Sequence, residues 1–310
     1  MGSSRAAGQV KPAGVYVAAV TPHRKEGHEV DLGAALELID YLCGAGVQGI
    51  AMLGSTGEFL HLTSDDRARL LDFAVKRSRV PIVAGVAHST LDGTVALALK
   101  AAEAGASAVL VMPPYFFRYK PPEVREYYLR LAERLASTVP ILLYNIPFFT
   151  TAIAPDIACE LLATGQFAGI KDSSGDYEYY AALKNQADSR GWTLLVGNDI
   201  VFTRCRRDGA DGVVSGVACA VPELMLALDE AIGMQLDEKV NRLEARLMEF
   251  IGWLDRFPAP VGVKEATAAR GLKVGPPAVP LAPDTARDLE RFRAWFKEWL
   301  PMVQSEAADR

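Results

Sequence analysis

The sequence predicts an α/β fold, a (β/α)8 TIM barrel with a C-terminal helical extension. Two observations predict the barrel. Short apolar runs alternate with amphipathic segments from residue 14 to about 215, and several connections from an amphipathic segment to the next apolar run contain a glycine at the same place. Runs of four to six mostly apolar residues are typical of parallel strands buried on both faces. A third observation, a purely helical pattern after Ser215, predicts the extension.

The apolar runs form a series of eight along the first two thirds of the chain. Eight strands, each followed by a helix, most simply close into a barrel. We therefore expect the following strands: Val15–Val20, Gly49–Leu53, Pro81–Val86, Ala108–Met112, Pro140–Tyr144, Phe167–Lys171, Thr193–Gly197 and Gly212–Ser215.

Between these runs lie segments whose apolar positions recur every three or four residues, the period of an amphipathic helix. Several connections from helix to strand place Gly just past the helix, where the chain must turn left-handed. They are 45–50, 104–109 and 208–213. The helical segments expected from the period are Leu32–Cys43, Asp65–Arg77, Thr94–Ala104, Glu123–Ala136 and Tyr177–Gln186.

An open, doubly wound sheet is the alternative to the barrel. Such a fold binds ligands at a crevice where the strand order reverses, and it usually carries a glycine-rich phosphate loop. The sequence contains no GxxxxGK[ST], and its one GxGxxG, at 44–49, leads from a predicted helix into a predicted strand, the reverse of the strand-to-helix order of a dinucleotide-binding loop. The barrel is therefore favoured, and a nucleotide-dependent enzyme has no loop to support it.

The residue pattern of the C-terminal third of the chain predicts four helices and no further strand. We expect the barrel to span 13–220 and the extension 221–300 to pack on it, with flexible tails at 1–12 and 301–310. The periodic Leu and Trp residues of the extension are interpreted as packing residues rather than ligand-binding ones. The predicted helices are Pro222–Gly233, Glu238–Phe257, Val261–Arg270 and Pro283–Leu300.

Composition narrows the class of protein. Half of the 310 residues are hydrophobic, and the net charge of −5 is spread without a basic stripe, which excludes nucleic acid as a partner. No apolar stretch approaches the ~18 residues that span a bilayer, and the first residues resemble no signal peptide. The four cysteines and four histidines show no metal-ligand spacing. We expect a cytoplasmic protein with no membrane contact and no metal.

Lys171 is the most informative residue for function. It closes the apolar run that begins at Phe167 and precedes a polar turn at 172–176. In a barrel the carboxyl ends of the strands form the active site. Desolvation there lowers the pKa of a lysine, and the free amine can attack a ketone to form a Schiff base. The alternative is an ordinary lysine whose charge reaches solvent.

Tyr144 ends the neighbouring predicted strand, about 4.8 Å from that of Lys171. If both side chains point inward, the phenol can shuttle a proton during carbinolamine formation and dehydration. Gly169, on the same face as Lys171, leaves room for a ligand. The alternative is a tyrosine that only packs.

The turn Gly54–Glu58 follows the second strand and lies across the barrel from Lys171. Its small residues, Ser55, Thr56 and Gly57, can direct backbone N–H groups and two hydroxyls at an anion, for which a carboxylate is the natural ligand. The alternative is a serine- and threonine-rich turn without a ligand. Together with the amine and the phenol, the turn predicts a site for a 2-oxo acid in which a C–C bond breaks or forms without a metal.

These motifs resemble the dihydrodipicolinate synthase / N-acetylneuraminate lyase superfamily over about residues 13–300. The similarity rests on 54–58, 144–147, 169–176, 197–199 and 263–266. It implies a (β/α)8 barrel that needs no cofactor, a pyruvate-type substrate and a homo-oligomer built as a dimer of dimers. It also implies roles for single residues: Lys171 forms the Schiff base, Tyr144 transfers protons, Ser55 and Thr56 bind the carboxylate, Gly57 and Gly197 belong to the site, Val214 lines the pocket, and Tyr115 reaches into a neighbouring subunit's site.

The chain departs from the family's synthases at Phe149, where they carry an arginine that holds the carboxylate of aspartate semialdehyde. A phenyl ring cannot make that bidentate contact. Sialic acid lyases have Glu after the motif Gly-x-Asp, whereas this chain has Ile200. The segment 57–63 is closer to aldolases of 4-hydroxy-2-oxoglutarate and of 2-keto-3-deoxy sugar acids.

The sequence therefore predicts a Schiff-base lyase that releases or condenses pyruvate, of the 2-keto-3-deoxy sugar acid or 4-hydroxy-2-oxoglutarate aldolase or dehydratase type. The first alternative is 4-hydroxy-tetrahydrodipicolinate synthase, which condenses pyruvate with aspartate semialdehyde. A more remote alternative is a barrel that binds a 2-oxo acid without turnover. Against it stands the joint presence of Lys171, Tyr144, Thr56 and Tyr115, since a pure binder needs no amine nucleophile.

Overall fold

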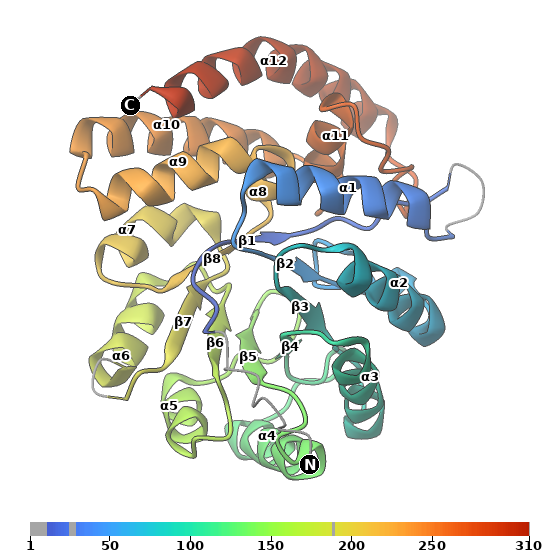
Figure 1. Cartoon of the computed structure of the whole chain (residues 1–310), viewed down its shortest axis with the longest axis vertical. Helices are drawn as coiled ribbons and strands as arrows, with labels where there is room; N and C mark the ends of the chain where they lie inside the picture. Colours follow the sequence, from blue (N-terminus) through green and yellow to red (C-terminus); the bar gives the residue numbers. More distant parts are fainter. Residues whose placement is uncertain (1–10, 25–28, 188–189, 310) are drawn as a thin grey trace, which may run out of the picture.

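The computed structural model describes residues 11–24, 29–187 and 190–309. Parallel strands β1 to β8 close into a barrel in which each strand pairs with its neighbours in the sequence and β8 pairs with β1 (Figure 1). The predicted fold class is confirmed. The strands are β1 Gly14–Ala18, β2 Gly49–Met52, β3 Ile82–Gly85, β4 Ala108–Val111, β5 Ile141–Asn145, β6 Gly169–Asp172, β7 Thr193–Val196 and β8 Gly212–Ser215.

All eight strands lie close to the apolar runs read from the sequence, because strands covered on both faces keep water from their whole length. From β2 to β8 every strand residue is buried. One boundary differs in a way that matters: β6 continues through Asp172, so Lys171 is its penultimate residue. Tyr144 is likewise the penultimate residue of β5.

The barrel helices surround the strands (Figure 1). Glycines end the helices as predicted: Gly46 and Gly105 sit at φ 87° and 89°, and their N–H groups bond to carbonyls of the last turn. The helices are α1 Leu32–Ala45, α2 Ser64–Arg77, α3 Leu91–Ala104, α4 Pro121–Leu135, α5 Pro155–Ala163, α6 Tyr177–Ala187, α7 Phe202–Arg207 and α8 Val217–Ala220, with 3-10 turns η1 Phe59–His61 and η2 Asp199–Val201.

Three of these helices, α5, α7 and α8, were not among the ranges predicted from the helical period. They have nine, six and four residues, and α8 is buried along its whole length. Segments this short give too few turns for a period to emerge, and a helix buried all round has no polar face.

The extension consists of α9 Pro222–Gly233, α10 Asp237–Leu254, α11 Val261–Ala269 and α12 Pro283–Ala308. In Figure 1 these helices lie together on one side of the barrel, beside α1 and α8. The predicted tail at 301–310 is wrong for 301–308, because α12 continues to Ala308 and Val303 in it is fully buried. Most of the other predicted tail, 1–12, lies outside the described residues. The division of the chain at residue 220 stays a prediction.

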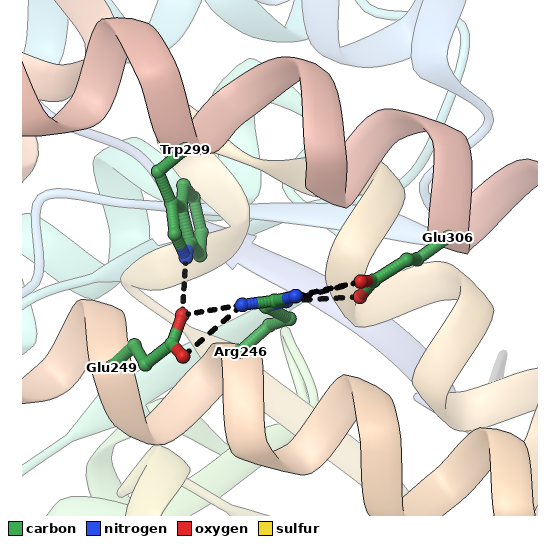
Figure 2. Close-up of polar contacts among 4 residues, drawn as sticks. All are labelled: Arg246, Glu249, Trp299 and Glu306. Atoms are coloured by element: carbon green, nitrogen blue, oxygen red, sulfur yellow. Dashed lines mark hydrogen bonds and ion pairs between the residues drawn. The ribbon is translucent and has the colours of Figure 1, made fainter.

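Two kinds of contact fasten α12 to α10. Aromatic rings of Phe250, Phe292 and Trp299 pack together, with the ring centroids of Phe250 and Trp299 5.4 Å apart. Figure 2 shows the polar contacts beside them: Arg246 binds both carboxylate oxygens of Glu306 and also Glu249, which accepts a hydrogen bond from the Trp299 indole at 2.8 Å. These contacts explain why the chain stays helical beyond residue 300.

Among the residues that the structure describes, no helix is both long enough and apolar enough to cross a membrane.

Candidate active site

Lys171 and Tyr144 are direct neighbours across the β5–β6 pair. Both are 4% exposed, and the Lys171 amine nitrogen lies 4.2 Å from the centroid of the Tyr144 ring. The expectation that one barrel end brings amine and phenol together is met by this geometry. An amine over the face of an aromatic ring is also held there electrostatically when it is charged.

The Tyr144 hydroxyl lies 3.3 Å from the Ser55 hydroxyl, so the turn after β2 reaches the end of β5. Burial raises the pKa of Tyr144, but the nearby Lys171 charge and the polar contacts with Ser55, Lys171 and Ser173 act the other way, and the net pKa is lowered. A phenol with a lowered pKa gives up its proton more readily near neutral pH, which suits it to proton transfer.

The turn 54–58 is held in an uncommon backbone shape. Leu53, which precedes the turn, and Glu58, its last residue, have φ values of 60° and 53°, in the left-handed region that residues other than glycine rarely adopt. The Thr21 hydroxyl donates to the Gly57 carbonyl at 2.7 Å, and the Glu58 N–H donates to the Ser55 carbonyl at 3.0 Å. The turn therefore presents its hydroxyls from a constrained backbone.

Thr56 is directed toward the end of β8. A Cβ built on Gly216, the residue after β8, would lie 3.6 Å from the Thr56 hydroxyl oxygen. Val214, in the same strand, is 4% exposed and pairs with Tyr16 of β1. Thr56, in the turn after β2, thus approaches the residue that follows β8, while Ser55 contacts Tyr144.

Gly197, directly after β7, covers the Lys171 side chain. A Cβ at this position would lie 2.5 Å from the Lys171 Cε and 2.1 Å from the Ser173 hydroxyl oxygen. The Gly197 N–H donates to the Asp172 carbonyl at 2.6 Å, and its own carbonyl accepts from Ser173 at 3.1 Å. Only glycine leaves the lysine stem its present position.

A buried amide and carboxylate fix the ends of β5 and β6. Asn145 donates to Asp172 at 2.7 Å and accepts the Ile153 N–H at 3.0 Å. Ser174 donates to the second Asp172 oxygen at 2.7 Å. Because Asn145 and Asp172 follow Tyr144 and Lys171 directly, this network holds the two strand ends that present the amine and the phenol.

Asp199 is a site residue that sequence reasoning did not single out. Burial raises its pKa to about 6, while Ser215, the Val217 amide and the Lys171 charge act in the opposite direction. Its Oδ1 atom is buried and has no hydrogen-bond partner among the described residues. The available signal was its place two residues after Gly197, at the carboxyl end of a barrel strand.

Tyr115 and Phe149 lie at the rim. Tyr115 forms a β-bridge with Thr150, and its ring packs edge-on against Phe59 with centroids 5.8 Å apart. The neighbouring Phe116, at φ 81° and 86% exposed, is the side chain that projects. Phe149 is 57% exposed. That Tyr115 enters a neighbouring subunit's site stays a prediction.

The described residues contain no group of three His, Cys, Asp or Glu side chains arranged to hold a metal ion. The groups that the barrel mouth does offer are a buried amine, a phenol with a lowered pKa and a hydroxyl-bearing turn. A lysine amine can act as a nucleophile toward a carbonyl carbon when a neighbouring group moves the protons. Fold and site together define a lyase of the class I aldolase type, which works through a lysine Schiff base.

The chain belongs to the dihydrodipicolinate synthetase family, whose model matches residues 11–298. The resemblance expected from the motifs is thereby confirmed. The chain is 30% identical over 284 residues to the 4-hydroxy-tetrahydrodipicolinate synthase of Methanothrix thermoacetophila, covering 90% of this chain and 94% of the relative. It is 33% identical to the synthase of Methanothermobacter thermautotrophicus, covering 86% and 95%.

Among solved structures, a prophage protein of the dihydrodipicolinic acid synthase family from E. coli K12, in complex with pyruvate, superposes with a TM-score of 0.84 at 26% identity. The match covers 92% of this chain and 98% of that chain. The names of the curated relatives agree with the first alternative from the sequence, the synthase, better than with the sugar-acid reading that was ranked above it.

Proposed function

We propose that this chain is a pyruvate-dependent lyase in which Lys171 forms a Schiff base with the ketone carbon of pyruvate. The observation that carries the proposal is the Lys171 amine, 4% exposed and 4.2 Å from the ring of Tyr144. The amine can attack a carbonyl carbon once a neighbouring group has taken its proton, and the Tyr144 phenol is the candidate for that role. A barrel that only bound a 2-oxo acid would have no need of this pair.

Each step can be assigned to a group at the site. The amine adds to C2 of pyruvate, and the carbinolamine that results loses its hydroxyl as water, with Tyr144 supplying the proton. The iminium then draws electrons from C3, which gives up a proton and becomes a nucleophilic enamine carbon. That carbon adds to an aldehyde, and water releases the product; the reverse sequence cleaves a C–C bond and liberates pyruvate.

The turn 54–58 is proposed to bind the pyruvate carboxylate. Its candidates are the Ser55 and Thr56 hydroxyls and the Gly57 N–H, which is compatible with the carbonyl of Gly57 being engaged by Thr21. Because Ser55 also contacts the Tyr144 hydroxyl at 3.3 Å, a carboxylate bound there would place C2 between the phenol and Lys171. Gly197 and Val214 are proposed to line the same pocket.

For the second substrate, the comparisons support aspartate semialdehyde. Both curated relatives described above are named 4-hydroxy-tetrahydrodipicolinate synthase and match nearly their whole length. We therefore place condensation of pyruvate with aspartate semialdehyde ahead of the sugar-acid reaction.

One specific observation favours a second candidate, an aldolase or dehydratase of 2-keto-3-deoxy sugar acids or 4-hydroxy-2-oxoglutarate. Phe149 stands where the synthases carry the arginine for the second carboxylate, and it is 57% exposed. Asp199 adds a carboxyl group with an unpartnered oxygen near Lys171. Such a carboxyl would accept a hydrogen bond from a hydroxylated substrate and repel a second carboxylate.

The proposal requires no cofactor, since the imine itself accepts the electrons. We also propose that the chain works as a homo-oligomer in the cytoplasm. The apolar side chains Phe116 and Phe117, 86% and 66% exposed, favour association with another copy, because exposed aromatic side chains gain from burial.

Borohydride reduction in the presence of pyruvate tests the proposal. The wild type is expected to gain the mass of one reduced pyruvyl group, and peptide mapping should place it on Lys171. Lys171→Ala should fold and form no adduct, whereas Lys100→Ala, which removes an exposed surface lysine, should behave as wild type. An adduct absent from the folded wild type, or found on another lysine, would refute the proposed mechanism.

The second substrate is decided with the same protein. Purified enzyme is supplied with pyruvate and aspartate semialdehyde, and separately with 2-keto-3-deoxy sugar acids and 4-hydroxy-2-oxoglutarate, while pyruvate consumption or release is followed. Consumption only with aspartate semialdehyde supports the synthase. Release of pyruvate from a hydroxylated 2-oxo acid, without turnover of aspartate semialdehyde, supports the second candidate.

A further inference from the structure

We propose that Lys264, in the C-terminal extension, is a positioning residue for the carboxylate-binding turn 54–58 and acts through a buried ion pair with Glu58. The inference rests on the proposed function of that turn and adds a residue from α11 to the groups that determine pyruvate affinity. Lys264 itself is not placed in contact with the substrate.

The ion pair is short and shielded from water. The Lys264 amine lies 2.8 Å from a Glu58 carboxylate oxygen, and the side chains are 4% and 5% exposed. The amine also lies 3.4 Å from the His23 ring nitrogen Nδ1 and donates to the Pro276 carbonyl at 3.3 Å. Low solvent exposure strengthens such an interaction and makes either partner costly to leave alone.

The partner that Lys264 holds is the last residue of the turn. Glu58 adopts φ 53°, a conformation that a residue with a side chain keeps only when its surroundings impose it. The polar contacts of its buried carboxylate are with Lys264 and, at 3.9 Å, with His61. Without the amine, a buried carboxylate would move toward water, and its backbone would lose the contact that keeps it left-handed.

A movement of the Glu58 backbone would be transmitted to Ser55, three residues earlier, whose hydroxyl is one of the proposed binding groups. The Glu58 N–H donates to the Ser55 carbonyl at 3.0 Å, and Ser55 contacts Tyr144 through its hydroxyl. Thr21 fixes the Gly57 carbonyl from the loop after β1, so the turn is anchored from two sides. Of these two anchors, only the one at Glu58 comes from the extension.

The ion pair also joins parts of the chain that are distant in sequence, since Lys264 and Glu58 are 206 residues apart. A purely structural role would lower stability and leave the affinity for pyruvate unchanged. A positioning role predicts a change in KM for pyruvate that exceeds any change in kcat, because the turn is proposed to bind the carboxylate and not to move protons.

The test is the steady-state kinetics of Lys264→Met, which keeps the length of the side chain and removes its charge. KM for pyruvate is expected to rise on the order of tenfold or more. This corresponds to the loss of one charge-assisted hydrogen bond between the displaced turn and the pyruvate carboxylate. Borohydride should still trap the adduct on Lys171 at saturating pyruvate, and Lys264→Arg should recover part of the affinity.

Arg246→Met is the matched control. It breaks ion pairs with Glu306 and Glu249, which are more exposed than the pair of Lys264 and Glu58 but lie in the same extension, away from the turn. We expect reduced thermal stability and an unchanged KM for pyruvate. If Lys264→Met does not fold, Glu58→Gln, which retains the shape of the side chain, gives the same comparison.

An unchanged KM in Lys264→Met or Glu58→Gln, in a protein whose wild type forms the Lys171 adduct, would overturn this inference alone. An equal rise in KM in Arg246→Met would also overturn it, because the effect would then follow loss of stability. A wild type that forms no adduct would instead refute the proposed function.

Discussion

The Ser55 hydroxyl lies 3.3 Å from the Tyr144 hydroxyl, and so joins the turn after β2 to the end of β5, three strands further round the barrel. Through this contact the carboxylate-binding candidates and the Schiff-base candidates belong to one site. It also contributes, after burial and the Lys171 charge, to the pKa of the phenol, which is lowered overall.

Tyr144→Phe should reduce kcat by about 10²- to 10⁴-fold, the usual contribution of a positioned acid or base. The adduct on Lys171 should still form, although more slowly, because the amine remains in place. The rate of adduct formation is measured by rapid quench-flow, in which the enzyme is mixed with pyruvate and the reaction is quenched with borohydride after set times.

Tyr127→Phe is the control for this variant. It also removes a phenolic hydroxyl, which bonds to the Thr94 hydroxyl at 2.9 Å between α4 and α3, outside the site. Its expected cost is about 1 kcal/mol of stability with unchanged kcat. A Tyr144→Phe enzyme with normal kcat would show that the phenol only packs.

Gly197→Ala should reduce activity by about 10²-fold while the barrel still folds. The added Cβ would lie 2.5 Å from the Lys171 Cε, so the lysine must move, and small misplacements of a reacting group are costly. The measurement is kcat/KM for pyruvate. Gly252→Ala, at a helical glycine with nothing within 4 Å of its built Cβ, is the control and should keep wild-type activity.

Asp199→Asn should remove a pH dependence of stability. The pKa of Asp199 is raised by burial from 3.8 to about 6 in the folded protein. Between these values the native state binds more protons than the unfolded chain, so stability falls as pH rises from about 4 to about 6. Melting temperatures across this range should show the decline in wild type and a smaller one in the variant.

Asp65→Asn serves as the control for Asp199, because the Asp65 side chain is 93% exposed. Its pH profile should follow that of the wild type. If Asp199→Asn showed the same decline as wild type, another group would be responsible for it.

Phe149→Arg should lower KM for aspartate semialdehyde by about tenfold or more, because a guanidinium can bind the carboxylate in a bidentate way. Phe148→Arg is the matched control, since it adds the same charge at the adjacent position, which is 67% exposed. Equal gains in both variants would point to a general effect of charge, and no gain in Phe149→Arg would contradict the interpretation of this position.

Much of the fold could be predicted because parallel strands that are buried on both faces appear in the sequence as continuous apolar runs. The end of α12 that was missed depends on contacts between segments that are distant in the sequence. Helix α12 passes residue 300 because Trp299 and Glu306 pack and pair with α10, and no period in the tail itself signals this. The short helix α7 has only six residues, too few for a helical period.

The sequence by itself determined the barrel, the family and the placement of Lys171 and Tyr144 at the carboxyl ends of neighbouring strands. These follow from local patterns and from the order of strands. Only the tertiary structure decided that Ser55 contacts Tyr144, that Gly197 covers the Lys171 stem, and that Lys264 pairs with Glu58 across 206 residues. Such relationships depend on side-chain direction and on contacts between distant segments, which chain closure creates and which no local pattern encodes.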